Sequence, residues 1–159
     1  MLKRLCLLTV SLLLVLAAPA GAVIVPGKGM AGAKLGQCIE KVVQEVGYPD
    51  KTFGKTEPTG EFVETYTYKK LGLKIRFFRG PGRCLVAGEF FTSKGKERTA
   101  EGVGKGTLRK TLKAKLKRVK CDSKRSCHIG SFTPSKRVTE FRIDSKGRIS
   151  TISVRVVSD

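Results

Sequence analysis

Apolar residues recur every four positions in two stretches of the chain, and this spacing predicts two short helices. Residues four apart lie on one face of a helix, so each stretch presents one apolar face to a core. We expect the first helix over residues 37–46, ending at Gly47 with Pro49 behind it, and the second to begin at Thr107 as its cap. The two apolar sets, seventy positions apart, are Cys38, Val42, Val46 and Leu108, Leu112, Leu116.

Strict alternation of apolar and polar residues predicts strands in both halves of the chain. The clearest case is residues 73–78, where Leu73, Ile75 and Phe77 alternate with basic residues. The segment 144–147 has the composition of a hairpin turn between two of the strands. The predicted strands are 62–68, 73–78, 84–91, 138–143 and 149–157.

The two halves follow one plan, which predicts a tandem repeat. Gly32 and Gly36 precede the first helix, and Gly102 and Gly106 precede the second at the same spacing. Each helix is followed by strands, and neither half has enough apolar residues for a separate core. We therefore predict an α+β fold of two helix-plus-antiparallel-sheet repeats, residues 24–92 and 98–157, which share one sheet layer and are linked by disulfides.

The first 22 residues have the three parts of a cleavable secretory signal peptide. Lys3 and Arg4 precede an apolar segment, residues 5–16, and the small residues Ala20 and Ala22 form an A-x-A cleavage pattern. The alternative is a membrane anchor, but the apolar run is shorter than the roughly 20 residues that span a bilayer. We expect a single secreted or extracytoplasmic domain, residues 23–159, after cleavage.

Four cysteines remain in the exported chain, which indicates disulfides in an oxidising compartment. Four cysteines allow three pairings. We expect Cys121–Cys127, which closes a short polar loop, and therefore Cys38–Cys84. A zinc site with His128 is the alternative, but the chain has no C-x-x-C pair and a single histidine. We predict no metal and no cofactor.

Basic residues surround the second predicted helix and continue into the Cys121–Cys127 loop. Removal of Lys3 and Arg4 lowers the formal charge of the chain from +19 to +17. A charge of this size bears on the partners and the solubility of the protein and not on its fold. Leucines on one helix face and lysines elsewhere also describe a membrane-surface helix, but the repeat places the leucines in the core. The residues we assign to this basic patch are Lys110, Lys113, Lys117, Arg118, Lys124 and Arg125.

The patch predicts an anionic partner, either an acidic protein or an anionic envelope polymer. Nonspecific contact with nucleic acid or an anionic membrane surface is also expected at low salt. No aromatic residue lies between Phe91 and Phe132, so base stacking has little support. The alternative is a solvated face with no dedicated partner.

The sequence contains no set of residues typical of catalysis, and we predict that the chain is not an enzyme. His128 is the single histidine and follows Cys127, which we expect in a disulfide, and the glycines at 102–106 do not match a phosphate-binding motif. We expect most of the acids, a set that includes Glu40, Glu57, Glu89, Glu97 and Glu140, to be partners for the surrounding lysines. A small-molecule substrate is therefore not predicted, and a small envelope enzyme is the least favoured of the alternatives.

The opening of the exported chain resembles a known group of small exported bacterial proteins. The pattern consists of Ile24-x-Pro26-Gly27, Lys34-Leu35-Gly36, Val42 and Val46-Gly47-x-Pro49. It is similar to the repeat of the β-lactamase-inhibitory protein and of small outer-membrane assembly lipoproteins, and the loop between Cys121 and Cys127 is similar to a disulfide loop of actinobacterial members. The resemblance implies a duplicated helix–helix–sheet unit and a role in binding other proteins.

The resemblance supplies a second hypothesis for function. An inhibitor-like protein would bind its target through the open sheet, and the contacts we predict for this case are Tyr66, Tyr68 and Arg76. The two hypotheses differ in salt response, because a charged patch weakens with salt while an aromatic contact changes little.

Overall fold

The computed structural model describes residues 23–80, 82, 84–94 and 96–158. The signal peptide predicted for residues 1–22 lies outside the described residues. The described chain is mostly sheet, with two helices. Its elements are β1 (Ile24–Val25), β2 (Gly29–Met30), β3 (Ala33–Lys34), α1 (Ile39–Val46), β4 (Lys51–Thr56), β5 (Phe62–Tyr68), β6 (Leu73–Arg79), β7 (Leu85–Thr92), α2 (Arg109–Lys115), β8 (Ser126–Gly130), β9 (Arg137–Ile143) and β10 (Ile149–Val156).

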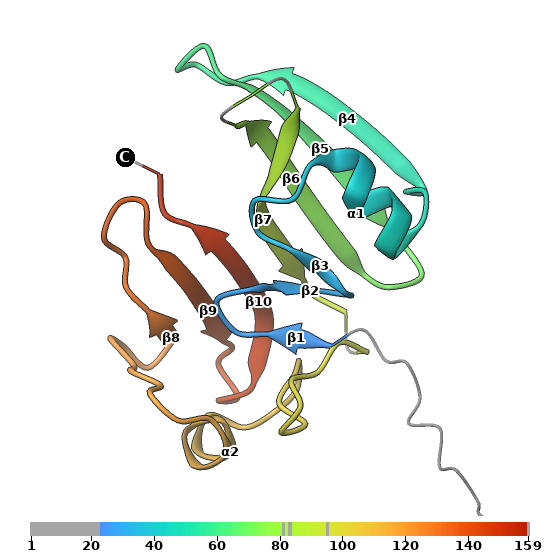
Figure 1. Cartoon of the computed structure of the whole chain (residues 1–159). Helices are drawn as coiled ribbons and strands as arrows, with labels where there is room; N and C mark the ends of the chain where they lie inside the picture. The colour runs from blue at the N-terminus through green and yellow to red at the C-terminus, as the bar shows by residue number, and fades with distance from the viewer. Residues whose placement is uncertain (1–22, 81, 83, 95, 159) are drawn as a thin grey trace, which may run out of the picture.

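Seven of the strands form one antiparallel sheet in the order β4-β5-β6-β7-β10-β9-β8. The strands of the first half meet those of the second at its centre, where Glu89 of β7 lies opposite Arg155 of β10. The short strands β1, β2 and β3 form a second antiparallel sheet. This small sheet and α1 lie across the same face of the large sheet, and α2 lies at the end of the molecule near β9 and β10 (Figure 1).

The core lies between the large sheet and these covering elements. Phe77, Phe90 and Phe141 supply its largest side chains from three strands of the sheet, and all three are fully buried. Val42 from α1 and Leu112 from α2 are buried in the same cluster. The opposite face of the large sheet carries no helix in the described part of the chain, so it is the open face (Figure 1).

Both helices lie where the apolar spacing predicted them, but each is shorter than expected. Gly47 ends α1 with a φ of 93°, a conformation that glycine adopts readily. The cap predicted at Thr107 is wrong, because α2 begins at Arg109. Instead, the Thr107 side-chain oxygen accepts a hydrogen bond from the Gly104 N–H at 3.1 Å and closes the turn ahead of the helix.

All five predicted strands are present to within two residues, and the sequence analysis missed β4, β8 and the three short strands. Every residue of β4 is exposed, so its hydrophobic pattern contains no alternation. The strand exists because its backbone pairs with β5 over six consecutive positions, from Lys51 opposite Thr67 to Thr56 opposite Phe62. Glycine is rare inside strands, and Gly54 at its centre is covered by the ring of Phe62.

The two disulfides are those predicted. Cys38–Cys84 ties the start of α1 to the start of β7, and Cys121–Cys127 closes a loop ahead of β8. Disulfides of this kind are typical of proteins that fold in an oxidising compartment outside the cytoplasm. Among the described residues, no helix is long and apolar enough to cross a membrane.

Candidate functional site

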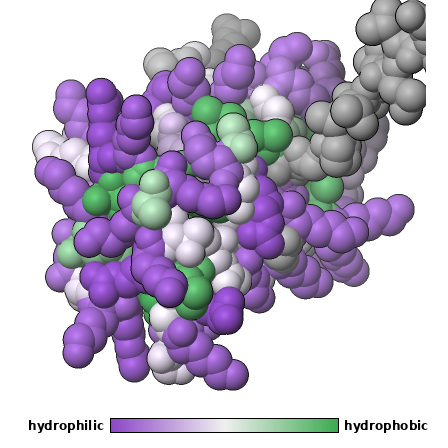
Figure 2. All heavy atoms as spheres, turned by 90° about the horizontal axis from the view of Figure 1, so that it is seen from below, coloured by the Kyte–Doolittle hydropathy of each residue, from purple (hydrophilic) through white to green (hydrophobic). Residues whose placement is uncertain are grey.

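The six basic-patch residues gather at one end of the molecule. Lys110 and Lys113 belong to α2, Lys117 and Arg118 follow it, and the remaining two lie in the Cys121–Cys127 loop. All six are exposed. Figure 2 views the molecule from this end and shows a surface dominated by long hydrophilic side chains with small apolar areas between them.

Packing of the second helix directs its basic side chains outward. Leu112 is fully buried and Leu116 is 6% exposed, so this side of α2 faces the core. Leu112 and Leu116 are therefore core residues, as expected, while Leu108 ahead of the helix is half-buried. Within the described residues, no ion pair joins any of the six patch residues to an acid.

The disulfide loop is fixed against the edge strand beside it. Lys120 and His128 exchange two backbone hydrogen bonds, of 2.9 and 2.7 Å, on either side of the loop. Asp122 brings a carboxylate oxygen to 2.9 Å from the His128 Nδ1 atom. These contacts fix the loop that carries Lys124 and Arg125 to the edge strand β8.

The residues predicted for a sheet contact do not share one face, which corrects that part of the prediction. Tyr66 and Tyr68 point to the face covered by α1, where Tyr66 packs edge-on against Phe77. Tyr68 is 3% exposed, and its hydroxyl donates a hydrogen bond of 3.2 Å to the Gly47 carbonyl. Burial raises the pKa of Tyr68 to about 12. Arg76 alone of the three lies on the open face.

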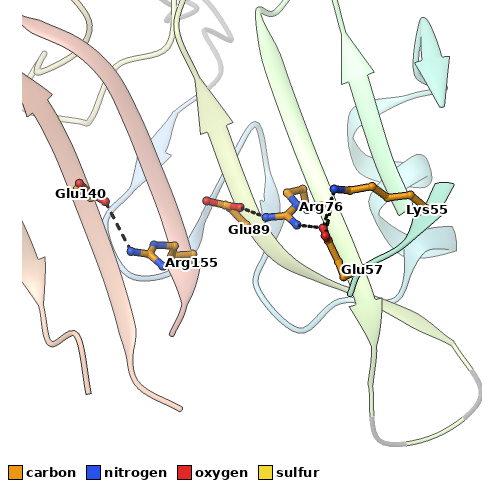
Figure 3. A network of polar contacts seen from close by, with 6 residues as sticks. All are labelled: Lys55, Glu57, Arg76, Glu89, Glu140 and Arg155. Atoms are coloured by element: carbon orange, nitrogen blue, oxygen red, sulfur yellow. Dashed lines mark hydrogen bonds and ion pairs between the residues drawn. The ribbon is translucent and has the colours of Figure 1, made fainter. Parts of the chain in front are cut away.

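Arg76 is the centre of an ion-pair network on that open face (Figure 3). Its two terminal nitrogens donate hydrogen bonds of 2.9 Å to Glu57 and 3.1 Å to Glu89. Glu57 in turn accepts a hydrogen bond of 3.0 Å from Lys55. These four side chains balance one another in charge, and Arg76 also lies 5.2 Å above the Phe78 ring. Opposite charges on neighbouring strands stabilise a sheet modestly.

A second cluster on the open face surrounds a shallow hollow that sequence analysis missed. Its centre is Glu140 of β9, whose carboxylate lies 3.3 Å from Arg142 Nε and 3.6 Å from Arg155 Nη2. The hollow has a volume of about 390 Å³ and is lined by Glu89, Phe91, Glu140, Arg142, Thr151, Ser153 and Arg155. These residues come from three strands, and only the strand order brings them together, so no local sequence signal marks the site.

Glu97 is buried, unlike the other acids among the described residues, and it is an exception to the expectation that most acids pair with lysines. It is 1% exposed, and neither carboxylate oxygen has a hydrogen-bond partner among the described residues. Burial disfavours the charged form and raises the pKa of Glu97 to about 7. Glu97 lies inside the fold rather than in a cleft, and we do not assign it a catalytic role.

The basic patch and the hollow offer a ligand mainly charged and hydroxyl groups, with the Phe91 ring beside those of the hollow. No three histidine, cysteine or acidic side chains come together among the described residues in an arrangement that would hold a metal ion. The basic patch offers ammonium and guanidinium donors, and the hollow offers guanidinium, carboxylate and hydroxyl groups. Both sites suit binding by hydrogen bonds and charge.

Fold and site together define a class: a disulfide-linked α+β protein built on one broad antiparallel sheet, with a basic end and an open face. No family model matches the chain, and no curated protein matches it. A solved structure with a similar fold is that of the uncharacterized protein yfeY from Escherichia coli, with a TM-score of 0.50 and 15% sequence identity over 81% of this chain and 97% of that chain. At this identity the likeness concerns the fold alone.

Proposed function

We propose that this chain is a non-catalytic binding protein that works outside the cytoplasm and holds an anionic partner at its basic patch. The observation that carries the proposal is the group of six exposed cations on α2 and the adjoining loop, none of which has an ion-pair partner among the described residues. Cations left without partners attract an external anion more strongly than paired ones. Two disulfides support the location.

The partner we favour is an anionic envelope polymer. The patch extends from α2 through the residues after it to the Cys121–Cys127 loop, and such a spread of exposed charges suits a flexible chain of repeated charges better than a compact ligand. Affinity would then come from release of counterions and would fall steeply with salt. An acidic protein is the other outcome, and it would require contacts beyond the patch.

Binding to defined anions across a salt series tests the proposal. The exported protein, residues 23–159, would be titrated with polyphosphate, poly-L-glutamate and anionic vesicles. We expect tight binding at low salt and a linear loss of log affinity with log salt. Reversing three patch charges, Lys113→Glu, Lys117→Glu and Arg118→Glu, should weaken binding by at least about tenfold and flatten this slope.

A matched variant separates the patch from the overall charge. Lys51→Glu, Lys70→Glu and Lys136→Glu changes the net charge by the same amount at exposed positions away from α2. This variant should retain most of the binding. Equal losses in the two triple variants would show that the whole basic surface attracts anions without a dedicated site, and the proposal would then be rejected.

We also propose that the two halves are copies of one helix-plus-sheet unit that share the large sheet. In the first half, Gly36 and Gln37 exchange backbone hydrogen bonds with Ala87 of β7. In the second half, Gly106 and Thr107 make the same exchange with Ile149 of β10. Gly36 and Gly106 also have nearly equal φ angles, 84° and 83°. The strand β4 and the different places of the disulfides distinguish the two copies.

A further inference from the structure

We propose that the hollow on the open face is a binding site for a carboxylate attached to an apolar group, such as the end or an acidic side chain of a partner peptide. The site is separate from the basic patch. The hollow opens over β10 between β7 and β9, whereas the patch lies on α2 and the Cys121–Cys127 loop. The inference therefore does not rest on the proposed function.

The shape of the hollow follows from short residues on its central strand. On the open face of β10 stand Thr151 and Ser153, followed by Arg155. The neighbouring strands carry longer side chains at these positions: Phe91 lies opposite Ser153 on β7, and Arg142 lies opposite Thr151 on β9. Short side chains between longer ones leave a trough whose floor bears two hydroxyl groups, with Arg155 at one end.

Two guanidinium groups and two carboxylates line the hollow, but one of the carboxylates is shared with the ion-pair network beside it. Glu89, which lines the hollow, accepts a hydrogen bond from Arg76 and belongs to the balanced network of Lys55, Glu57, Arg76 and Glu89. The remaining cluster has two guanidinium groups, of Arg142 and Arg155, for the single carboxylate of Glu140. It therefore carries one positive charge in excess, which a ligand anion would neutralise.

The two arginines have hydrogen-bonding capacity to spare. A guanidinium group has five N–H donors in a planar fork and binds a carboxylate best through two parallel bonds of about 2.7–2.9 Å. Glu140 lies farther away, at 3.3 Å from Arg142 and 3.6 Å from Arg155. Its hold on each arginine is therefore loose. The Phe132 ring, 5.8 Å from Arg155 Cζ, supports the guanidinium from the side.

The aromatic wall indicates what the carboxylate is attached to. Phe91 lines the hollow and is partly exposed there. A ligand whose carboxylate reaches Arg155 would place its next few atoms beside the Phe91 ring. An apolar group is favoured there, because contact with the ring removes apolar surface from water. An apolar residue next to a carboxylate has this arrangement, whereas inorganic phosphate lacks the apolar part.

The test uses 3-phenylpropionate as the probe and 3-phenylpropanamide as its uncharged counterpart. NMR would follow the Nε–Hε signals of Arg142 and Arg155 and the backbone amides of Thr151 and Ser153 in the exported protein. We expect saturable shifts at these positions with a Kd on the order of millimolar for the carboxylate. The amide should give no saturable shift, and inorganic phosphate should bind at least about tenfold more weakly.

Two variants predict opposite changes in affinity. Arg155→Gln should weaken binding by about tenfold or more, since it removes the donors that face the carboxylate. Glu140→Gln should strengthen binding, because it removes the internal carboxylate that competes with the ligand. A gain of affinity cannot arise from misfolding. The control is Arg137→Gln, which also changes one charge on β9, at a position whose side chain faces away from the hollow. It should leave the affinity unchanged.

Three results would overturn the inference. One is a shift pattern confined to α2 and the disulfide loop, which would assign the anion to the basic patch. Another is equal binding of the carboxylate and the amide, and the third is an affinity unchanged or lowered by Glu140→Gln. Failure here leaves the polymer-binding proposal intact, since that proposal is tested by the Lys113, Lys117 and Arg118 reversals.

Discussion

Glu97 introduces an ionisable group into the core of the protein without a partner for its charge. In the unfolded chain the carboxyl group ionises near its ordinary pKa of 4.5, and in the folded protein its pKa is raised to about 7. Between these values the folded state holds a proton that the unfolded state has lost. The contribution of Glu97 to stability is therefore fully present below pH 4.5 and is lost as the pH rises through 7.

Substitution of Glu97 by glutamine should remove this pH dependence. We expect the wild-type protein to lose on the order of 2 kcal/mol of unfolding free energy, relative to Glu97→Gln, between about pH 5 and pH 8. Urea unfolding at several pH values measures the difference. Glu61→Gln, at an exposed acid, is the control and should lose as much unfolding free energy over this pH range as the wild type. Parallel curves for the wild type and Glu97→Gln would contradict the prediction.

Single residues also show what the sequence could predict. The exposure of Lys110 and Lys113 on α2 was predictable, because lysines that surround an apolar helical stripe face outward once the stripe is buried. Tyr68 was misjudged because an aromatic residue on a strand fits either face of a sheet. Only the position of α1 decides which face is covered, and Tyr68 hydrogen-bonds to Gly47 at the end of that helix.

At the scale of elements, each helix depends on one fully buried side chain. Neither α1, of eight residues, nor α2, of seven, is long enough to be stable alone. We expect Leu112→Ala to cost about 3 kcal/mol of unfolding free energy, because it leaves a cavity beneath α2. Lys113→Ala, one residue on and exposed, should cost less than about 0.5 kcal/mol. Similar losses in the two variants would show that α2 does not depend on packing.

Helices and strands were predictable where one of their faces is buried, because burial leaves a periodic pattern of apolar and polar residues in the sequence. The strand β6 alternates because one of its faces is in the core, and its predicted start at Leu73 is correct. The edge strand β4 has no buried residue, and β8 has five residues that include a cysteine and a histidine. Their positions are set by backbone pairing with β5 and β9, which depends on the fold as a whole. The hollow was unpredictable for the same reason.

The two disulfides should differ in their effect on stability. Cys38 and Cys84 are separated by 46 residues, and Cys121 and Cys127 by 6. The longer loop restricts the unfolded chain more, so replacing the first pair by serine should cost about 4 kcal/mol and the second about 2 kcal/mol. Chemical unfolding of each double variant measures this. A larger loss for Cys121–Cys127 would indicate that its loop stabilises the native edge strand directly.

At the scale of the whole molecule, the formal charge of +19 opposes folding. Like charges are closer together in the folded protein than in the unfolded chain, and few acids compensate for them. The ion pairs of Arg76 with Glu57 and Glu89 lie on the open face of the sheet, and among the described residues no acid forms an ion pair with a member of the basic patch. A bound anion at the patch would therefore reduce repulsion that no internal ion pair offsets.

Salt should therefore stabilise this protein. We expect the unfolding free energy to rise by on the order of 1 kcal/mol between about 0.02 M and 0.3 M NaCl, because salt screens repulsion between exposed charges. Reversal of Lys113, Lys117 and Arg118 to glutamate should raise stability at low salt and reduce the salt effect, while reversal of Lys51, Lys70 and Lys136 should do so less. Thermal unfolding across the salt series measures both. A stability that falls with salt would mean that ion pairs such as those of Arg76 outweigh the repulsion. If the rise of the unfolding free energy with salt depends on the patch residues, then α2 and its loop hold like charges close together at a cost in stability. Such a cost is expected of a surface that binds anions.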